Sequence, residues 1–413
     1  MSFHTHLECT KCGNQVKGFG YTCPKCGASL EARYNLEAAK AVLSRNSLES
    51  RKIRSMWRYA ELLPPRPENI VSLGEGSTPL IRSKRLGNSL GLDSLMLKLE
   101  YSSPTGSFKD RGSSAMISMA SQLGVNTVFL DSSGNAAFSV SAYSAKLGTN
   151  CFVFVPEYTS EGKVIQSLAY GSKVLKIKGN RKDAYNAAEY VRRKFGWYYC
   201  GFQTNPYSIE GSKTIAFEVL EQLDWAVPDW VVFPVGTGSA MLGFFKGMQE
   251  LKALGIVDQQ AALACVQPEG CCPIASGLKR NSSEIIPVNQ PKTVAEGLMI
   301  GLPINGLRVI DAVRATEGVG EIVSDPEILR AGAELASLEG IFVEPSAAAS
   351  SAGVKKLVNG GIIERGDTVV CILTGSGLKT QESYRPSVKD IPSIYPREEE
   401  LEATVLGLLE MGK

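Results

Sequence analysis

One lysine of this chain stands where its side-chain amine could act as a nucleophile. Lys109 follows a segment of mostly small residues, 102–107, at the expected end of a strand and the start of a helix. Partial removal from water lowers the pKa of a lysine and makes its amine nucleophilic, which suits formation of a Schiff base. The spacing is equally typical of an ordinary lysine at a helix start beside Asp110 and Arg111.

A second polar turn, residues 131–137, could bind a carboxylate. Ser132 and Ser133 supply hydroxyl groups, Gly134 allows a tight turn, and the expected helix start supplies free amides. Such a set suits an anion of carboxylate size. Helix capping by a single serine is the ordinary alternative, and it needs only one of these residues.

Two glycine-rich turns complete the set of candidate binding segments. The first consists of Gly236, Thr237, Gly238, Ser239 and Ala240. Its backbone amides and the following helix could hold a phosphate. The spacing matches neither GxGxxG nor GxxxxGK[ST], so a single phosphate monoester fits better than a nucleotide. In the other turn, 373–377, the hydroxyl of Thr374 could face a ring nitrogen, or the segment could be a simple turn.

A lysine, a carboxylate site, a single-phosphate site and a hydroxyl together outline a pocket for pyridoxal phosphate. The chain has only two histidines, His4 and His6, which we expect at a frayed N-terminus. Histidine is the usual general base near neutral pH. A Ser-His-Asp or Cys-His catalytic arrangement is therefore excluded, and another residue must move protons.

The elements that would position these turns alternate along the chain. Apolar runs predict buried parallel strands. A helix is predicted to start at Asp325 and Pro326, with a cap and a proline in its first turn, and to stop at Gly340. The apolar stripe of this helix contains Ile328, Ala331, Leu335 and Leu338. The predicted strands are 95–101, 127–130, 151–155, 174–177, 230–233, 263–266 and 368–373. This alternation predicts an α/β fold with two sheet-centred lobes, whose turns lie at the carboxyl ends of strands, where ligands bind.

Four cysteines form a separate unit near the N-terminus. Cys9, Cys12, Cys23 and Cys26 make two CxxCG turns, a spacing typical of a tetrahedral Zn²⁺ site. Four protein ligands would leave no open position, so the site would be structural. Two disulfides or unligated thiols are the alternatives.

Composition narrows the remaining possibilities. The chain has 413 residues and a net charge of +2, which gives no reason to expect a nucleic-acid or membrane partner. The apolar runs are too short to span a membrane, and no secretory signal is recognisable, so we expect a cytoplasmic enzyme. The expected domains are a zinc-ribbon-like segment (1–30), a large α/β domain (31–100 and 211–384), a small α/β domain (101–210), and a linker with a C-terminal helix (385–413). The apolar face of that helix, Leu401, Val405, Leu408 and Leu409, is expected to pack on the body or on a sister subunit.

Several of these segments resemble a known family. The chain resembles the fold-type II (tryptophan synthase β-like) pyridoxal-phosphate enzymes, and among them the threonine synthases, which also include members with an N-terminal zinc-ribbon-like segment. The resemblance spans nearly the whole chain from about residue 30. It rests on segments 74–79, 104–112, 133–135, 205–211, 339–345 and 373–375.

The resemblance implies a role for each part of the pocket. Lys109 would carry the cofactor as a Schiff base and shuttle protons, next to Phe108 in the cofactor site. Asn135 would bond to the ring oxygen of the cofactor, the segment from Gly236 to Ala240 would hold its phosphate, and Thr374 would meet the pyridine nitrogen. The implied enzyme is a lyase that converts O-phosphohomoserine and water to threonine and phosphate. The resemblance also implies a homodimer.

The chain departs from the family at the second phosphate site, which would bind the substrate. Family members use there a threonine after the Ser/Thr-Gly-Asn turn, an arginine in Asn-Pro-x-Arg and polar residues upstream. This chain has Ala136, Ser208 and the pair Phe202-Gln203 at those places, and Thr237 and Ala240 where asparagines are usual in the cofactor phosphate loop. A charge-assisted hydrogen bond from arginine to phosphate is worth roughly 1.5–3 kcal/mol, so its loss matters. Lys163 and Lys213 are the candidate replacements.

Three functions therefore stay open. The first is threonine synthase, with Ser132, Ser133, Ala136 and Gln203 facing the substrate. The second is an enzyme acting on an unphosphorylated amino acid, either an ammonia-lyase of the threonine or serine dehydratase type or a β-replacement enzyme. The third is an inactive paralogue whose zinc ribbon docks to another protein.

Overall fold

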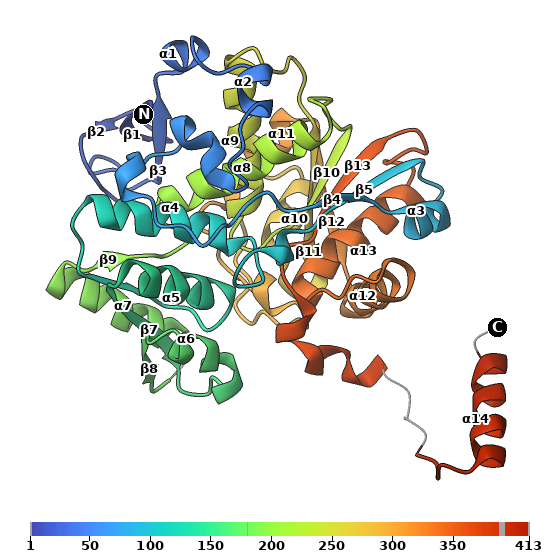
Figure 1. Cartoon of the computed structure of the whole chain (residues 1–413). Coiled ribbons are helices and arrows are strands. Elements are labelled where there is room, and N and C mark those ends of the chain that lie inside the picture. The colour runs from blue at the N-terminus through green and yellow to red at the C-terminus, as the bar shows by residue number, and fades with distance from the viewer. Residues whose placement is uncertain (1, 180, 388–392, 412–413) are drawn as a thin grey trace.

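Three sheets organise the part of the chain that the computed structural model describes, residues 2–179, 181–387 and 393–411 (Figure 1). The largest sheet has six strands in the order β12 (Val319–Val323), β11 (Ala262–Pro268), β10 (Trp230–Pro234), β13 (Thr368–Ile372), β5 (Ser94–Lys98) and β4 (Leu80–Arg82). All its neighbouring strands pair in parallel except β4, which is antiparallel to β5. This sheet is the centre of one lobe.

Both faces of the large sheet are covered, which explains its nearly continuous apolar strands. On β10, Val231 and Phe233 belong to the core cluster formed with helices α8 and α9, while Val232 belongs to the cluster on the opposite face with α12 and α13. Successive side chains of a strand point to opposite faces. A strand buried on both sides therefore has to be apolar throughout.

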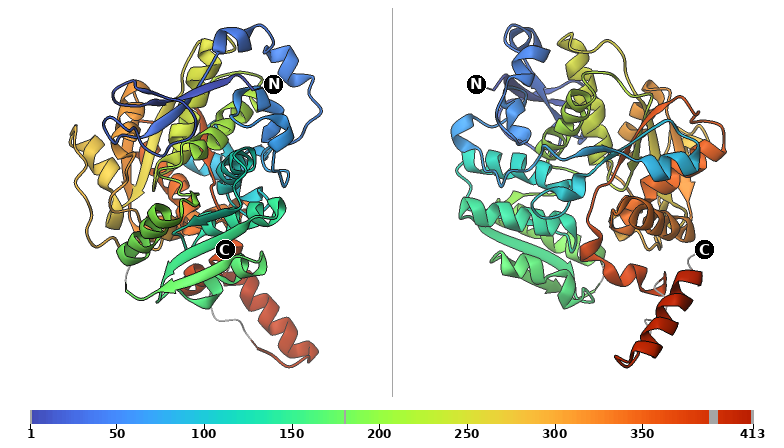
Figure 2. Two further views of the ribbon diagram at one scale, coloured as in Figure 1. Left: turned by 90° about the vertical axis from the view of Figure 1, so that its left-hand side faces the viewer. Right: turned by 45° about the vertical axis from the view of Figure 1, so that its right-hand side comes forward.

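A four-stranded parallel sheet is the centre of the second lobe. Its order is β8 (Lys173–Ile177), β7 (Asn150–Pro156), β6 (Thr127–Leu130) and β9 (Tyr198–Tyr199). The helices of the chain are α1 (Leu36–Lys40), α2 (Arg45–Glu49), α3 (Lys84–Leu90), α4 (Lys109–Gln122), α5 (Asn135–Leu147), α6 (Ile165–Ala169), α7 (Arg181–Phe195), α8 (Tyr207–Gln222), α9 (Ser239–Ala253), α10 (Pro273–Lys279), α11 (Gly306–Ala315), α12 (Asp325–Glu339), α13 (Pro345–Asn359) and α14 (Glu398–Met411). Both lobes are visible in Figure 2. The predicted mixed α/β fold is confirmed.

The N-terminal sheet is antiparallel and lies against both lobes. Its order is β2 (Gln15–Val16), β1 (His4–Cys9) and β3 (Leu30–Tyr34). The hydroxyl of Tyr21 accepts a hydrogen bond from the backbone amide of Tyr199 in the smaller lobe. Glu31 forms an ion pair of 2.7 Å with Arg308 of α11 in the larger lobe.

The expectation of a frayed N-terminus is wrong. His4 and His6 both lie in β1, where they pair with β3. The ring of His4 makes edge contacts with Tyr34 and Tyr207. Burial lowers the pKa of His4 to about 4 and outweighs the opposing effect of Glu210, so this histidine is neutral at pH 7.

The predicted elements differ from the observed ones mainly at their ends. Strand β5 stops at Lys98 and continues as the 3₁₀ helix η3 (Glu100–Ser102), whereas the sequence predicted a strand to residue 101. Helix α12 is capped by Ser324, because the carboxylate of Asp325 instead accepts hydrogen bonds from Thr293 and Val294. No helix of the described residues is long and apolar enough to cross a bilayer.

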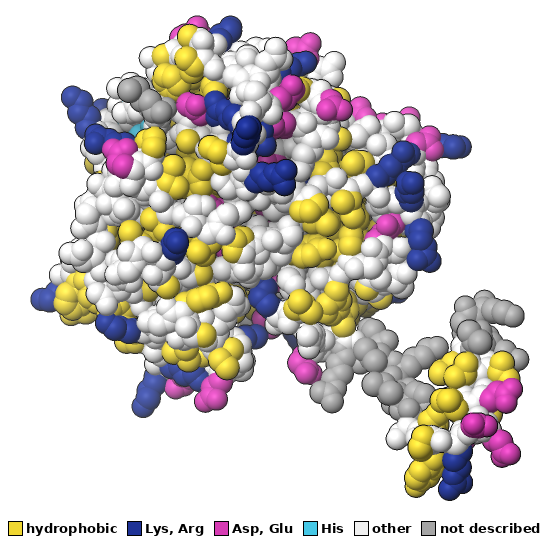
Figure 3. All heavy atoms as spheres, viewed as in Figure 1, with side chains coloured by type: hydrophobic (Ala, Val, Ile, Leu, Met, Phe, Trp, Pro, Cys, Tyr) yellow, Lys and Arg dark blue, Asp and Glu magenta, His cyan; other side chains and the backbone are white. Residues whose placement is uncertain are grey.

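The C-terminal helix stands apart from the body (Figures 1 and 2). Its apolar side chains are exposed, including Leu401, Val405 and Leu408 (Figure 3). The expected packing on the body of the same chain is therefore wrong, and packing on a sister subunit stays a prediction. The Leu409 side chain lies outside the described residues. Of the predicted linker, 385–387 belong to the 3₁₀ helix η8 (Gln381–Ser387), and residues 388–392 are not described.

Candidate active site

Lys109 is the first residue of α4 and is enclosed by two aromatic rings. Its Nζ lies 4.6 Å from the ring centre of Phe108 and 4.1 Å from that of Phe202. Burial lowers the pKa of the amine from its ordinary 10.5 to about 7, and the Glu344 carboxylate opposes this shift. Near neutral pH a large share of this lysine is therefore uncharged and nucleophilic.

The two charged neighbours of Lys109 are engaged elsewhere. Asp110 accepts hydrogen bonds from the amide and hydroxyl of Thr105 and from the hydroxyl of Ser139. Arg111 is fully buried and pairs at 2.7 Å with both Glu100 and Glu218. These bonds hold the turn and the helix start in place. The geometry therefore favours the nucleophilic alternative over an ordinary lysine beside Asp110 and Arg111.

The Thr374 turn lies directly against the turn that carries Lys109. Strands β5 and β13 are parallel neighbours, so the segments that follow them emerge at the same edge of the sheet. The amide of Phe108 donates to the carbonyl of Thr374 at 3.0 Å, and Ser107 and Gly375 form an isolated antiparallel bridge. The side chain of Ser107 is fully buried, and its hydroxyl oxygen has no hydrogen-bond partner among the described residues.

The glycine-rich turn between β10 and α9 has no room for larger side chains. A Cβ atom on Gly238 would lie 2.4 Å from Val309, and Gly238 has a φ of +85°. A Cβ atom on Gly236 would lie 2.8 Å from the carbonyl oxygen of Gly297. Helix α9 begins at Ser239 with no side-chain cap, so its first amide groups are available to an anion. The hydroxyl of Thr237 lies 3.3 Å from that of Ser239, and Ala240 is buried.

The serine-rich turn brings Asn135 toward the same region. Ser132, Ser133, Gly134 and Ala136 are all partly exposed, and α5 begins at Asn135. The side-chain amide of Asn135 donates to both carboxylate oxygens of Glu344, at 3.0 Å each. The amide of Glu344 in turn donates to the carbonyl of Gly375. Asn135, Glu344 and the Thr374 turn are therefore connected by direct hydrogen bonds.

Two charged residues of this region were not identified from the sequence. Glu344 is buried, and burial raises the pKa of its carboxyl group, although Lys379, Asn135 and Lys109 act in the opposite direction. Lys379, at the end of the 3₁₀ helix η7 (Gly377–Lys379), donates to the side-chain oxygen of Asn135. Glu344 directly precedes the first proline of α13 and lies in the family-like segment 339–345, but neither its residue type nor that of Lys379 marks a binding site.

The residues expected near the substrate phosphate have other partners. Gln203 binds the loop before α11: its side-chain oxygen accepts from the amide of Ile304, and its carbonyl accepts from Asn305. Ser208 is buried and donates to the carbonyls of Phe202 and Asn205. The structure therefore joins Gln203 to the opposite lobe.

The two lysines considered as phosphate ligands behave differently. Lys213 is fully buried and bound to Glu210 and Glu250, so the expectation that it could replace the arginine is wrong. Lys163 is half exposed and pairs with Glu296 at 2.7 Å. Glu296 is close enough to Glu344 to raise the pKa of its carboxyl group, so the pair of Lys163 and Glu296 lies near the edge of the site.

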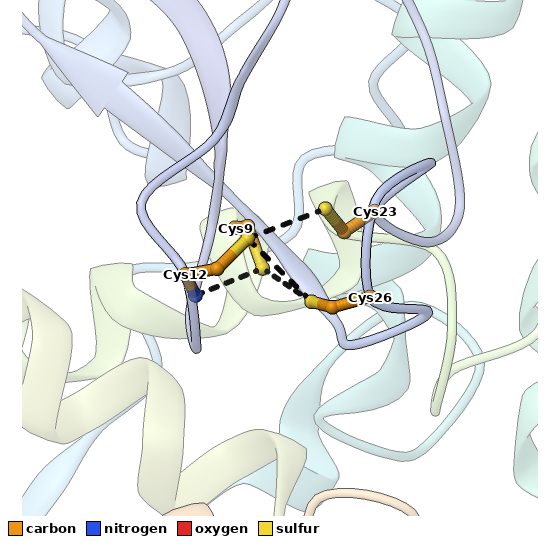
Figure 4. A group of neighbouring side chains, drawn as sticks. All are labelled: Cys9, Cys12, Cys23 and Cys26. Carbon is orange, nitrogen blue, oxygen red and sulfur yellow. Dashed lines mark hydrogen bonds between the residues drawn. The ribbon is translucent and has the colours of Figure 1, made fainter.

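The four N-terminal cysteines form one cluster (Figure 4). Their sulfur atoms lie within 4.8 Å of one another, and the separations between hydrogen-bonded sulfurs are 3.4–3.7 Å. A disulfide bond would require about 2.05 Å, so these are free thiols. Sulfurs about 2.3 Å from a tetrahedral Zn²⁺ are about 3.8 Å apart, close to the spacing seen here. The cluster consists of Cys9, Cys12, Cys23 and Cys26.

Comparison with known proteins identifies the class of enzyme. The family model described as "Pyridoxal-phosphate dependent enzyme" matches residues 71–375, and the chain belongs to this family. Among curated proteins, the threonine synthase of Methanocaldococcus jannaschii is 42% identical over 380 residues, which are 91% of this chain and 93% of that protein. The threonine synthase of Methanosarcina acetivorans is 41% identical over 381 residues, 92% and 93% of the two chains. The predicted resemblance to threonine synthases is therefore confirmed.

Solved structures support the same fold. A threonine deaminase of Solanum lycopersicum, in its processed form, superposes with a TM-score of 0.64 at 22% identity, over 74% of this chain and 82% of that one. The L-serine ammonia-lyase of Rhizomucor miehei gives a TM-score of 0.66 at 24% identity, over 76% and 98%. The chain thus has the fold of type II pyridoxal-phosphate enzymes.

Proposed function

We propose that this enzyme is a threonine synthase, which converts O-phosphohomoserine and water to threonine and phosphate. The two archaeal relatives support this function, since they carry that name at 41–42% identity over more than nine-tenths of the chain. The observation that carries the chemistry is the buried amine of Lys109, whose pKa of about 7 makes it both a nucleophile and a proton carrier.

The residues of the site fit pyridoxal phosphate. The two glycines at 236 and 238, where a Cβ atom would collide, and the uncapped start of α9 suit a phosphate monoester. The buried Ser107 hydroxyl lacks a protein partner among the described residues, as expected of a group that faces a polar ligand. When bound, the cofactor supplies an electron sink that stabilises negative charge on the α carbon.

In this proposal each element of the site has a defined task. Lys109 would hold the cofactor and move protons at the α and β carbons of the substrate. Asn135 would hold the ring oxygen of the cofactor, and the neutral hydroxyl of Thr374 would lie at its pyridine nitrogen. Phe108 and Phe202 exclude water from the amine of Lys109. The backbone of residues 236–240 holds the cofactor phosphate, and Ser132 and Ser133 bind the substrate carboxylate.

One observation favours the second candidate, an ammonia-lyase acting on threonine or serine. Ser208 stands where the family arginine is expected, and its hydroxyl bonds to two backbone carbonyls. Purified enzyme should therefore be assayed for phosphate release from O-phosphohomoserine and for keto-acid release from threonine and serine. Phosphate and threonine as the main products support the proposal. Keto acid without phosphate release overturns it in favour of the ammonia-lyase. Lys109→Ala should abolish either reaction, whereas Lys356→Ala, on the outer part of α13, should not.

We further propose that the cysteine cluster holds a structural Zn²⁺ and that the enzyme is a homodimer. The sulfur spacing supports the first point, and light scattering tests the second by a mass of about twice the 44.4 kDa chain. The domain boundaries near residues 30, 100, 210 and 384 are part of the same proposal. Strand β3 extends the N-terminal sheet to Tyr34. Limited proteolysis tests these boundaries through cleavage sites that cluster at them.

A further inference from the structure

The side-chain amide of Asn135 is held at both of its ends. Its oxygen accepts a hydrogen bond of 2.5 Å from the ammonium group of Lys379, and its nitrogen lies 3.0 Å from each carboxylate oxygen of Glu344. The two oxygens of one carboxylate are so close together that a single N–H group serves both, and the second N–H group is left for another acceptor. The reverse orientation would place the amide oxygen against a carboxylate and the NH₂ group against an ammonium group. Both contacts would then be repulsive, so the partners allow one orientation of the amide.

Lys379 is itself fixed by the turn that carries Lys109. Besides Asn135, its ammonium group donates to the carbonyls of Thr105 at 3.1 Å and of Gly106 at 3.0 Å. An ammonium group has three hydrogen atoms to donate, and these three acceptors use all of them. The carbonyl of Gly106 also accepts a hydrogen bond from the amide of Ser376. Lys379 belongs to η7, so its bonds link three segments of the site: the turn before α4, the start of α5 and η7.

We propose that Lys379 is a positioning residue, which fixes the Asn135 amide so that its NH₂ group, and not its oxygen, faces the ring oxygen of pyridoxal phosphate. This inference rests on the proposed role of Asn135 in cofactor binding. The ring oxygen carries negative charge and needs a donor. A flipped amide would present a second oxygen to it and repel it.

This orientation has a consequence for the bound cofactor. With the cofactor bound, loss of a proton near the nitrogen of Lys109 would leave more negative charge on the ring oxygen. A donor at that oxygen stabilises the deprotonated form, so the pH midpoint of the visible absorbance of the bound cofactor is lowered. Without Lys379 the amide oxygen loses its donor, and only the contact with Glu344 still orients the amide. The amide is then held less firmly, and the midpoint should rise.

The test is a pH titration of the visible absorbance in cofactor-loaded protein. Lys379→Met should raise the midpoint by about one pH unit, the size expected for one lost hydrogen bond. Lys379→Arg, which keeps the donors, should restore most of the shift. Lys379→Gln is too short to reach Asn135 and should behave like Lys379→Met, which gives a second variant if the first does not fold.

A double-mutant cycle separates positioning from a simple effect of charge. In an Asn135→Ala background, Lys379→Met should leave the midpoint unchanged, because the residue on which Lys379 acts is absent. An equal shift in both backgrounds, or no shift in the parent enzyme, overturns the inference. The readout is the bound cofactor and not turnover. Coloured enzyme that releases no phosphate would therefore refute the threonine synthase proposal and leave this test valid.

Discussion

The amine of Lys109 lies 4.1 Å from the ring centre of Phe202. The two residues are far apart in the sequence, since Lys109 lies near the start and Phe202 near the end of the segment that forms the smaller lobe. Phe202 also packs against the start of α4, since a Cβ atom on Gly112 would lie 2.8 Å from its ring. An aromatic ring in this place keeps water from the amine. The nucleophile of the site is therefore tuned by a residue at one of the positions where threonine synthases are expected to have polar side chains.

Replacing this ring should change the pH dependence of cofactor binding. In cofactor-free enzyme only the neutral amine reacts, so the rate of reaction with pyridoxal phosphate should rise with pH through about 7 and then level off. Phe202→Asn admits water and should move this midpoint upward by about one unit or more. Stopped-flow absorbance measures the rate. Phe195→Asn, which alters an exposed ring, should leave the midpoint in place.

The glycine at position 238 should be essential for cofactor affinity. Gly238→Ala adds a Cβ atom 2.4 Å from Val309 in a backbone with φ of +85°, so the turn has to move away from the cofactor phosphate. We expect the dissociation constant of pyridoxal phosphate to rise by at least about tenfold, as measured by fluorescence titration. Gly124→Ala is the matched control, because it has a similar φ of +68° but open space around it. An unchanged affinity in Gly238→Ala would contradict the proposed phosphate site.

The buried cation beside the nucleophile should matter for stability. Arg111→Met leaves the carboxylates of Glu100 and Glu218 buried without their main partner, and breaking such a pair costs about 3–5 kcal/mol. Urea denaturation should show this loss. The exposed pair of Arg365 and Asp93 provides the control, and Arg365→Met should cost less than about 1 kcal/mol. If Arg111→Met lowered the free energy of unfolding as little as Arg365→Met, the buried cluster would contribute little to stability.

The cysteine cluster predicts the metal content of the protein. Purified enzyme should contain about one zinc ion per chain, as measured by atomic emission. Cys12→Ser should lose the metal and lower the melting temperature. Cys272→Ser, which changes a cysteine outside the cluster, should keep both. Zinc retained at full occupancy in Cys12→Ser would exclude this site.

The parts of the site that follow single strands could be predicted from the sequence. Strand 127–130 has the predicted limits, and the turns at Lys109, Asn135, Gly236 and Thr374 do follow strands or their extensions. This succeeded because parallel strands buried on both faces form short apolar runs, and their carboxyl ends carry the binding turns. The local pattern contained all of this information.

The contacts between distant segments could not be predicted in the same way. Lys379 reaches Asn135 across 244 positions, and Glu344 reaches it across 209. Neither spacing leaves a periodic signal. The strand β4 was also missed, because three residues at the sheet edge carry too little alternation to be recognised. The ion pairs of Lys213 with Glu210 and Glu250 could not be predicted either. They depend on how α8 and α9 pack, and not on the residues next to Lys213 in the sequence.

The N-terminal sheet and its loops contact both lobes at once, through Tyr21, between β2 and β3, on the smaller lobe and Glu31 of β3 on the larger lobe. If one lobe rotates against the other, the small sheet can follow only one of them. The contact with the other lobe must then break. A relative rotation of the two lobes therefore acts on contacts made by residues remote in sequence from Lys109. A change in the first thirty-four residues could alter the speed of product release while every group around the reacting amine stayed the same.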